Sequence, residues 1–131
     1  MSLHSIFFGA LAAVVATAWM GVGCAKDHPD KPVKIIVPYT PGGQADLAVR
    51  IIAEKFTASL GKSFVVLNLP GSSGIAAMNS ALAAPADGYT IAYVDAGHWA
   101  INVALNPKLP YDPEKDFVPI GLFGETTGLF L

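Results

Sequence analysis

Residues 33–46, VKIIVPYTPGGQAD, decide the fold of this chain. The run Val33–Pro38 is apolar on both faces once Lys34 is passed, which is typical of a buried parallel strand. Gly42 and Gly43 then predict a turn that opens directly into a helix. The first amides of a helix have no partner inside it, so they point beyond the strand end and attract anions.

A second strand, glycine turn and helix follow over residues 64–84, with the turn sequence NLPGSSG at 68–74. Strands that alternate with helices predict an α/β fold with a mostly parallel sheet and right-handed crossovers. The expected elements are a strand at Val33–Pro38, a helix at Gly43–Leu60, a strand at Ser63–Leu67, a helix at Ile75–Ala84, a strand at Tyr89–Val94 and a short helix at His98–Leu105.

The first helix carries signals at both of its ends. Asp46 lies in its first turn, where a negative charge complements the helix dipole, and Arg50 lies four residues on as its ion-pair partner. Gly61 is a natural stop. The apolar stripe expected to face the sheet consists of Ala48, Ile51, Ile52, Phe56 and Leu60.

The last part of the chain is expected to be a proline-punctuated connection, Asn106–Pro119, followed by strands at Ile120–Phe123 and Leu129–Leu131. The sequence stops on the apolar residues GLFL with no polar cap. We therefore interpret residues 26–131 as a truncated lobe whose last strand continues elsewhere.

The first 25 residues contain no Asp, Glu, Lys or Arg, and Ile6–Val22 is almost wholly apolar. This run is at the short limit for spanning a bilayer, roughly 17–25 residues, and small residues follow it. We therefore expect residues 1–25 to be a signal peptide cleaved after Ala25, which makes the protein periplasmic. The alternatives are an uncleaved anchor or a lipid on Cys24, although Gly21 stands where a lipoprotein usually has a bulky aliphatic residue.

Composition excludes several classes of function. The net charge is −2 and Arg50 is the only arginine, so the positive surface needed for nucleic acid is missing. Cys24 is the only cysteine and lies in the predicted leader, which leaves the mature domain without a disulfide or a thiol nucleophile. His28 stands alone, so no metal-ligand cluster is expected. No nucleotide-binding glycine motif or Walker lysine is present, and we expect no cofactor.

Ligands of open α/β sheets bind beyond the carboxyl ends of the strands, where three loops of this chain should meet. These loops are Tyr39–Gly43, Gly71–Gly74 and Asp95–Trp99. Glycines let a ligand approach the backbone closely, and the hydroxyl side chains add donors without charge. The residues expected to contact a small carboxylate are Tyr39, Thr40, Gly42, Gly43, Ser72, Ser73, Gly74, Asp95, Ala96, His98 and Trp99.

Other interpretations stay open. The glycines can serve only as tight turns, and His98 can be a residue at the rim of its loop. Ser72 or Ser73 with His98 and Asp95 offers the ingredients of a hydrolase triad, but no G-x-S-x-G elbow surrounds the serines. A third possibility is a fragment without function.

The chain resembles the extracytoplasmic solute receptors of the tripartite tricarboxylate transporters, also called Bug receptors. The resemblance covers essentially all of residues 26–131. The segments that carry it are Asp30–Val33, Ile36–Pro38, Pro41–Gly43 with Asp46 and Arg50, Asn68 with Pro70, Gly71 and Gly74, Asp87–Thr90, Asn102 with Leu105, Pro110–Asp112, and Asp116–Phe117.

The resemblance implies a periplasmic-binding-protein fold of two α/β lobes, of which this chain holds the first. It implies a ligand such as a citrate-like acid, an acidic amino acid or an aromatic acid, held by loop amides, hydroxyls and water. It also implies delivery to membrane permease subunits or to a sensor. The chain departs from the family at Ser72-Ser73, where Ala-Gly is usual, and at Leu69, which often has a basic counterpart.

Cleavage of the leader can be tested by expressing the whole chain in a Gram-negative host. We expect intact-mass spectrometry of the periplasmic product to give a polypeptide that begins at Lys26, because residues 23–25 are small enough for signal peptidase. A product that retains residue 24 and carries added lipid mass would contradict this prediction.

Overall fold

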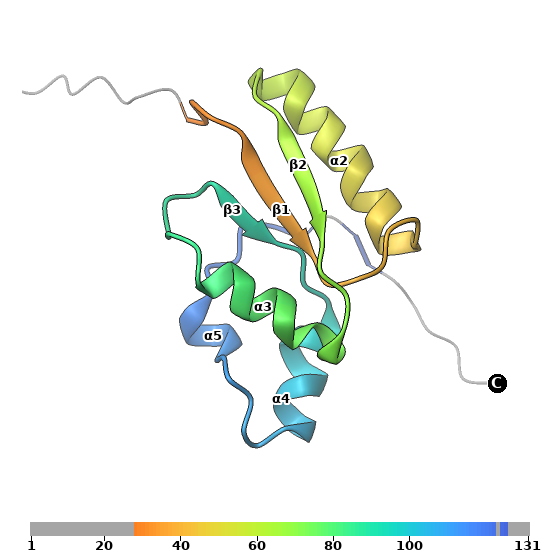
Figure 1. Ribbon diagram of the computed structural model, residues 1–131, viewed down its shortest axis with the longest axis vertical. Coiled ribbons are helices and arrows are strands. Elements are labelled where there is room, and N and C mark those ends of the chain that lie inside the picture. The colour runs from red at the N-terminus through yellow and green to blue at the C-terminus, as the bar shows by residue number, and fades with distance from the viewer. Residues whose placement is uncertain (1–27, 123, 126–131) are drawn as a thin grey trace, which may run out of the picture.

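The computed structural model describes residues 28–122, 124 and 125. The elements along this part of the chain (Figure 1) are β1 (Val33–Val37), α2 (Gln44–Leu60), β2 (Phe64–Asn68), a 3-10 turn (Ser72–Gly74), α3 (Ile75–Leu82), β3 (Thr90–Ala92), a π turn (Gly97–Ile101), α4 (Asn102–Leu105) and α5 (Pro113–Asp116). The predicted leader, residues 1–25, and the predicted strand Leu129–Leu131 lie outside the described residues.

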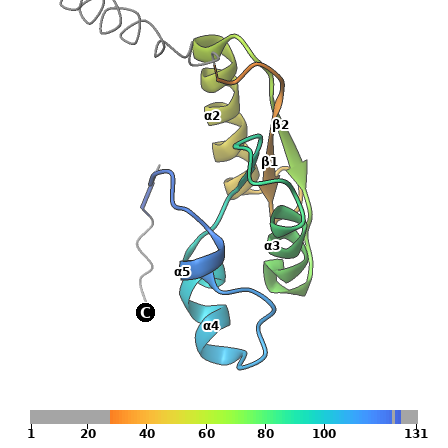
Figure 2. The same cartoon turned by 90° about the vertical axis from the view of Figure 1, so that its left-hand side faces the viewer.

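The three strands form a parallel sheet in the order β2-β1-β3, which confirms the predicted fold class. The central strand β1 is buried on both faces. Ile35 packs against Val49 and Ala53 of α2, whereas Ile36 packs against Met78 of α3. Because successive side chains of a strand point to opposite faces, the two helices cover opposite sides of the sheet (Figure 2).

The buried face of α2 differs from the expected stripe. Asp46, Val49 and Ala53 are the buried positions, while Ile51 and Phe56 are 60% and 42% exposed. Of the other residues expected to face the sheet, Ala48 and Ile52 are half-buried and Leu60 is exposed. The helix packs mainly on β1 and β2, so fewer of its side chains reach the sheet than the predicted stripe contains. The prediction failed because a polar residue, Asp46, occupies part of the buried line.

The predicted connection Asn106–Pro119 contains a short helix, α5, which its prolines did not suggest. Asp112 caps α5, its Oδ1 accepting a hydrogen bond from the Glu114 amide at 3.1 Å, and Pro113 occupies the first helical turn. This is a favoured arrangement at a helix start, where the proline lacks only an amide that would have no helical partner.

The predicted strand at Ile120–Phe123 is wrong over its described part. Residues 120–122 form no strand, and Ile120 and Leu122 are each 79% exposed. A strand needs a neighbour to satisfy its backbone groups, and none of the three described strands pairs with this segment. Phe123 lies outside the described residues.

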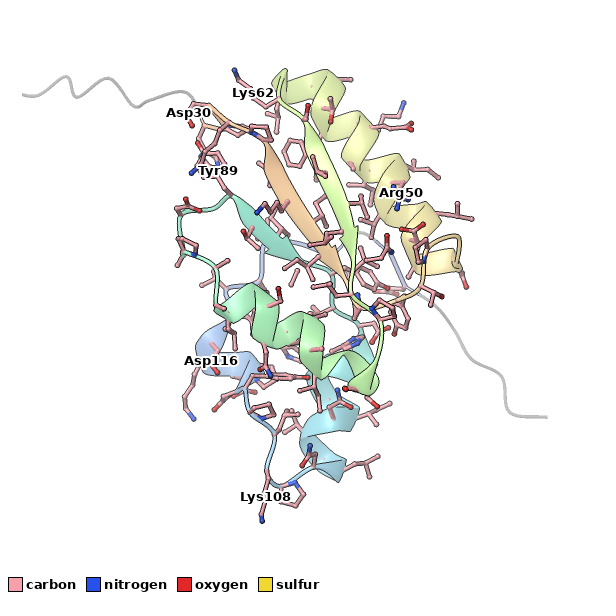
Figure 3. All side chains as sticks on the ribbon, viewed as in Figure 1. Asp30, Arg50, Lys62, Tyr89, Lys108 and Asp116 are labelled. Carbon is pink, nitrogen blue, oxygen red and sulfur yellow. The ribbon has the colours of Figure 1, made fainter. Side chains whose placement is uncertain are left out.

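A polar cluster lies at the edge of the sheet where β1 and β3 begin. Lys31 Nζ lies 3.0 Å from Asp87 Oδ2 and 4.1 Å from the centroid of the Tyr89 ring. The Tyr89 hydroxyl donates to Asp30 Oδ1 at 2.5 Å. Figure 3 shows Asp30 and Tyr89 together there, and Lys108 at the opposite end of the molecule.

Candidate ligand-binding site

A recess of about 200 Å³ lies where the carboxyl ends of the three strands meet. Each of the three predicted loops contributes to it, because parallel strands end at the same edge of the sheet. The lining residues are Pro38 and Tyr39 after β1, Gly71, Ser73 and Gly74 after β2, and Gly97, His98 and Asn102 after β3.

Four of the eleven residues predicted to contact a ligand line this recess: Tyr39, Ser73, Gly74 and His98. The others lie on the same loops but do not line it: Thr40, Gly42, Gly43, Ser72, Asp95, Ala96 and Trp99. Asn102 was not predicted. Its position four residues after His98 on a helical segment places both side chains on one face, which is the signal that identifies it.

His98 is not a rim residue, because it is only 4% exposed. Its ring packs on Gly74, where a Cβ atom would lie 2.1 Å from His98 Nε2. Gly74 also has φ +80°, a left-handed conformation that favours glycine. The sequence predicts that this glycine lets a ligand approach the backbone closely, whereas in the structure it leaves room for the imidazole of His98.

Asp95 holds the loop after β3 together. Its carboxylate accepts hydrogen bonds from the Tyr39 hydroxyl and from the Gly97 amide (2.9 Å), and it lies 2.8 Å from His98 Nδ1. Burial raises the pKa of Asp95, but these contacts outweigh it and lower the pKa overall. Burial and the bond to Asp95 together raise the pKa of Tyr39. The carboxylate is therefore already occupied by protein donors.

Asp46 connects the loop after β1 with the end of β2. The side chain is 1% exposed, and its Oδ2 accepts hydrogen bonds from Arg50 Nε at 2.9 Å and from the Gly42 amide at 2.8 Å. Asn68 Nδ2 donates to Asp46 Oδ1 at 2.9 Å and to the Tyr39 carbonyl at 3.0 Å. Arg50, followed by the Gly42 amide and Asn68, lowers the pKa of Asp46. The predicted Asp46–Arg50 pair is confirmed.

Two amides of the predicted anion site are used within the protein. The Gly42 amide donates to Asp46, and the Gly74 amide donates to the Gly71 carbonyl at 2.9 Å. In this structure these two amides are therefore not free to donate to a ligand. Ser72 and Ser73 have φ values of 50° and 51°, which are uncommon for residues other than glycine. Within the described part of the chain, their hydroxyls have no hydrogen-bond partner.

The described residues contain no group of three His, Cys, Asp or Glu side chains that could hold a metal ion. None of their helices is both long enough and apolar enough to cross a bilayer.

Residues 48–130 match the family model described as "Tripartite tricarboxylate transporter family receptor", and the chain belongs to this family. It is 33% identical over 113 residues to protein BugT of Bordetella pertussis, an alignment that covers 85% of this chain and 35% of BugT. A protein from the tcbD–tcbE intergenic region of Pseudomonas sp. strain P51 is 38% identical over 94 residues, covering 72% and 28%.

Solved structures agree with this assignment. A periplasmic transporter superposes with a TM-score of 0.69 at 39% identity, covering 72% of this chain and 32% of that one. A protein of R. palustris with adipate gives 0.68 at 38% identity, covering 72% and 31%. MatC from Rhodopseudomonas palustris with bound malate gives 0.67 at 35% identity, covering 70% and 31%. The chain thus spans about a third of the length of the relatives it matches.

The role of Asp46 predicts an acid-sensitive stability. The pKa of Asp46 is lower in the folded state than in the unfolded state, so its contribution to folding is complete above the unfolded value of about 4 and is lost as the pH falls toward the folded value. We expect Asp46→Asn to lower the free energy of unfolding at neutral pH, with a difference from the wild type that shrinks below about pH 4.

Urea denaturation at a series of pH values measures this difference, and Glu54→Gln on the exposed face of α2 is the matched control. A difference that stays constant from neutral to acidic pH would show that the Asp46 charge contributes nothing.

The packing of His98 on Gly74 predicts that an added methyl group is costly there. Gly74→Ala and Gly61→Ala both place alanine in a left-handed conformation, at about 1–2 kcal/mol each. No atom lies within 4 Å of the Cβ position at Gly61, so only Gly74→Ala should lose about 1–3 kcal/mol more through overpacking. Equal losses in denaturant unfolding would contradict the packing.

Proposed function

We propose that residues 26–131 form the first lobe of an exported, non-catalytic receptor that binds a small organic carboxylate without a cofactor. The observation that carries the proposal is the recess at the carboxyl ends of β1, β2 and β3, which is lined by one loop from each strand. Two solved relatives hold adipate and malate, both small dicarboxylates, which supports this class of ligand.

The recess favours uncharged donors over a cationic clamp. Arg50, the only arginine, is bonded to Asp46 and to Asn68 Oδ1, the latter at 3.0 Å, and it does not line the recess. The Ser73 hydroxyl is the donor side chain that a carboxylate would meet, because Asn102 Nδ2 also donates to the Tyr111 hydroxyl, at 3.3 Å. Asn102 Nδ2 already donates to the Ser73 carbonyl at 2.8 Å, so the helix after β3 is tied to the loop after β2.

A single lobe is expected to bind weakly. The few donors of the recess, at roughly 1.5–3 kcal/mol for each charge-assisted hydrogen bond, are opposed by an association cost of about 4–15 kcal/mol. The balance for an open half-site is near zero. A second lobe that closes over the ligand would exclude water and add contacts, so tight binding requires the remainder of a full-length receptor.

We further propose that residues 1–25 direct export to the periplasm. There the receptor would deliver its ligand to the permease subunits of a tripartite carrier or to a sensor, with no nucleic-acid partner. The apolar, uncharged start of the chain and the family to which it belongs support this role.

A serine hydrolase is the second candidate, and one contact favours it: Asp95 lies 2.8 Å from His98 Nδ1, as in a catalytic dyad. A nucleophile must also lie within hydrogen-bond reach of the base. His98 Nε2 packs against Gly74 instead, and no described hydrogen bond joins it to Ser72 or Ser73. The geometry therefore supports a receptor better. A fragment without function is the third interpretation.

Titration of the isotope-labelled 131-residue chain with adipate and malate tests the proposal by nuclear magnetic resonance. We expect amide shifts confined to residues 39–43, 71–74 and 95–102, with dissociation constants of roughly millimolar order because one lobe acts alone. Glucose should cause none of these shifts.

Ser73→Ala is expected to weaken carboxylate binding, whereas Ser80→Ala, on the exposed side of α3, should leave it unchanged. Shifts that are identical for glucose and for the acids would overturn the ligand class. No response to any acid would favour the fragment, and ester turnover that Ser73→Ala abolishes would favour the hydrolase.

A further inference from the structure

His98 is held in one orientation by three neighbours. Its Nδ1 lies 2.8 Å from Asp95 Oδ1, its ring meets Tyr39 edge to face with centroids 5.6 Å apart, and its Nε2 edge lies on Gly74. The side chain is nearly fully buried yet lines the recess. The imidazole is therefore a fixed part of the recess wall.

The contact with Asp95 determines which nitrogen carries the proton. Two groups of Asp95 face Nδ1: the carboxylate Oδ1 at 2.8 Å, which can only accept a hydrogen bond, and the backbone amide at 3.4 Å, which can only donate one. The carboxylate is much the nearer, so the neutral imidazole places its proton on Nδ1 and leaves a lone pair on Nε2. Within the described residues, Nε2 has no hydrogen-bond partner. No fully buried side-chain nitrogen or oxygen of the described residues lacks a partner, so Nε2 keeps some accessible surface beside Gly74, where it can act as an acceptor.

Tyr39 presents the same polarity. Its hydroxyl proton is donated to Asp95 Oδ2, so the phenolic oxygen can only accept a further hydrogen bond. The two ring side chains that line the recess thus offer acceptors, while the Ser73 hydroxyl supplies a donor. An ionised dicarboxylate without other polar groups carries only acceptors and cannot satisfy Nε2.

We propose that His98, positioned by Asp95 and Tyr39, is a specificity-determining residue that selects carboxylates bearing a hydrogen-bond donor such as a hydroxyl or an ammonium group. The carboxylate of the ligand lies toward Ser73, and its donor group lies toward His98 Nε2. This inference rests on the proposed receptor function, because it concerns the same recess.

The tautomer can be measured without any ligand. Imidazole ¹⁵N chemical shifts of the wild-type chain at mildly basic pH should show His98 protonated on Nδ1. Asp95→Asn should redistribute the proton toward Nε2, because an amide side chain can turn its nitrogen toward the ring. A wild-type His98 protonated on Nε2 would overturn the proposal, whether or not any acid binds.

Ligand selectivity is the second readout. Malate should bind the wild-type chain roughly 2- to 10-fold more tightly than succinate, which lacks only the hydroxyl. Aspartate tests the ammonium group in the same way. In His98→Phe the malate preference should disappear while succinate binding persists, and Lys108→Ala, at a residue that does not line the recess, should keep the wild-type ratio.

If His98→Phe does not fold, Asp95→Asn is the replacement and should reduce the same ratio. Equal binding of malate, aspartate and succinate by the wild type, or a malate preference that survives in both variants, would overturn the role of His98 while leaving the receptor function intact. Failure of all three acids to bind would instead count against the receptor function.

Discussion

The buried carboxylate of Asp46 is the contact on which the geometry of the recess depends. It accepts hydrogen bonds from the loop after β1, from α2 and from the end of β2, so one side chain joins three elements. A buried charge is tolerated only when it is paired and hydrogen-bonded. The carboxylate of Asp46 meets both conditions, because it pairs with Arg50 and accepts hydrogen bonds from three donors. The single arginine is thereby committed to structure and does not line the recess.

Gly74 and His98 show how the second half of the recess is assembled. The glycine lacks the atom that would collide with the imidazole, and Asp95 fixes the opposite side of the ring. Asn102 then ties the following helix to the loop after β2. These contacts join the loop after β2 to the loop after β3. Most polar side-chain atoms around the recess therefore have hydrogen-bond partners within the protein, and only a few face the open space.

The sequence was sufficient to predict the parallel sheet, because buried strands and glycine turns are local signals. β1 and β2 were placed within one residue of their observed ends. It was also sufficient to predict which three loops converge. It could not predict that Asp46 would be buried with hydrogen bonds from the Gly42 amide and Asn68, or that His98 would pack on Gly74. Both arrangements depend on contacts between residues far apart in the sequence. The strand predicted at residues 120–122 was wrong for the same reason, because a strand needs a neighbouring strand that the local sequence does not reveal.

The polar cluster of Lys31, Asp87 and Tyr89 has a practical consequence. It links the segment before β1 to the segment before β3 at the edge of the sheet opposite the recess, because the strands begin at this edge and end at the recess. A membrane tether, an affinity tag or a fluorescent reporter attached before residue 28 would therefore join the fold on the side opposite the recess. Immobilising the protein through that side would leave the mouth of the recess open to solution.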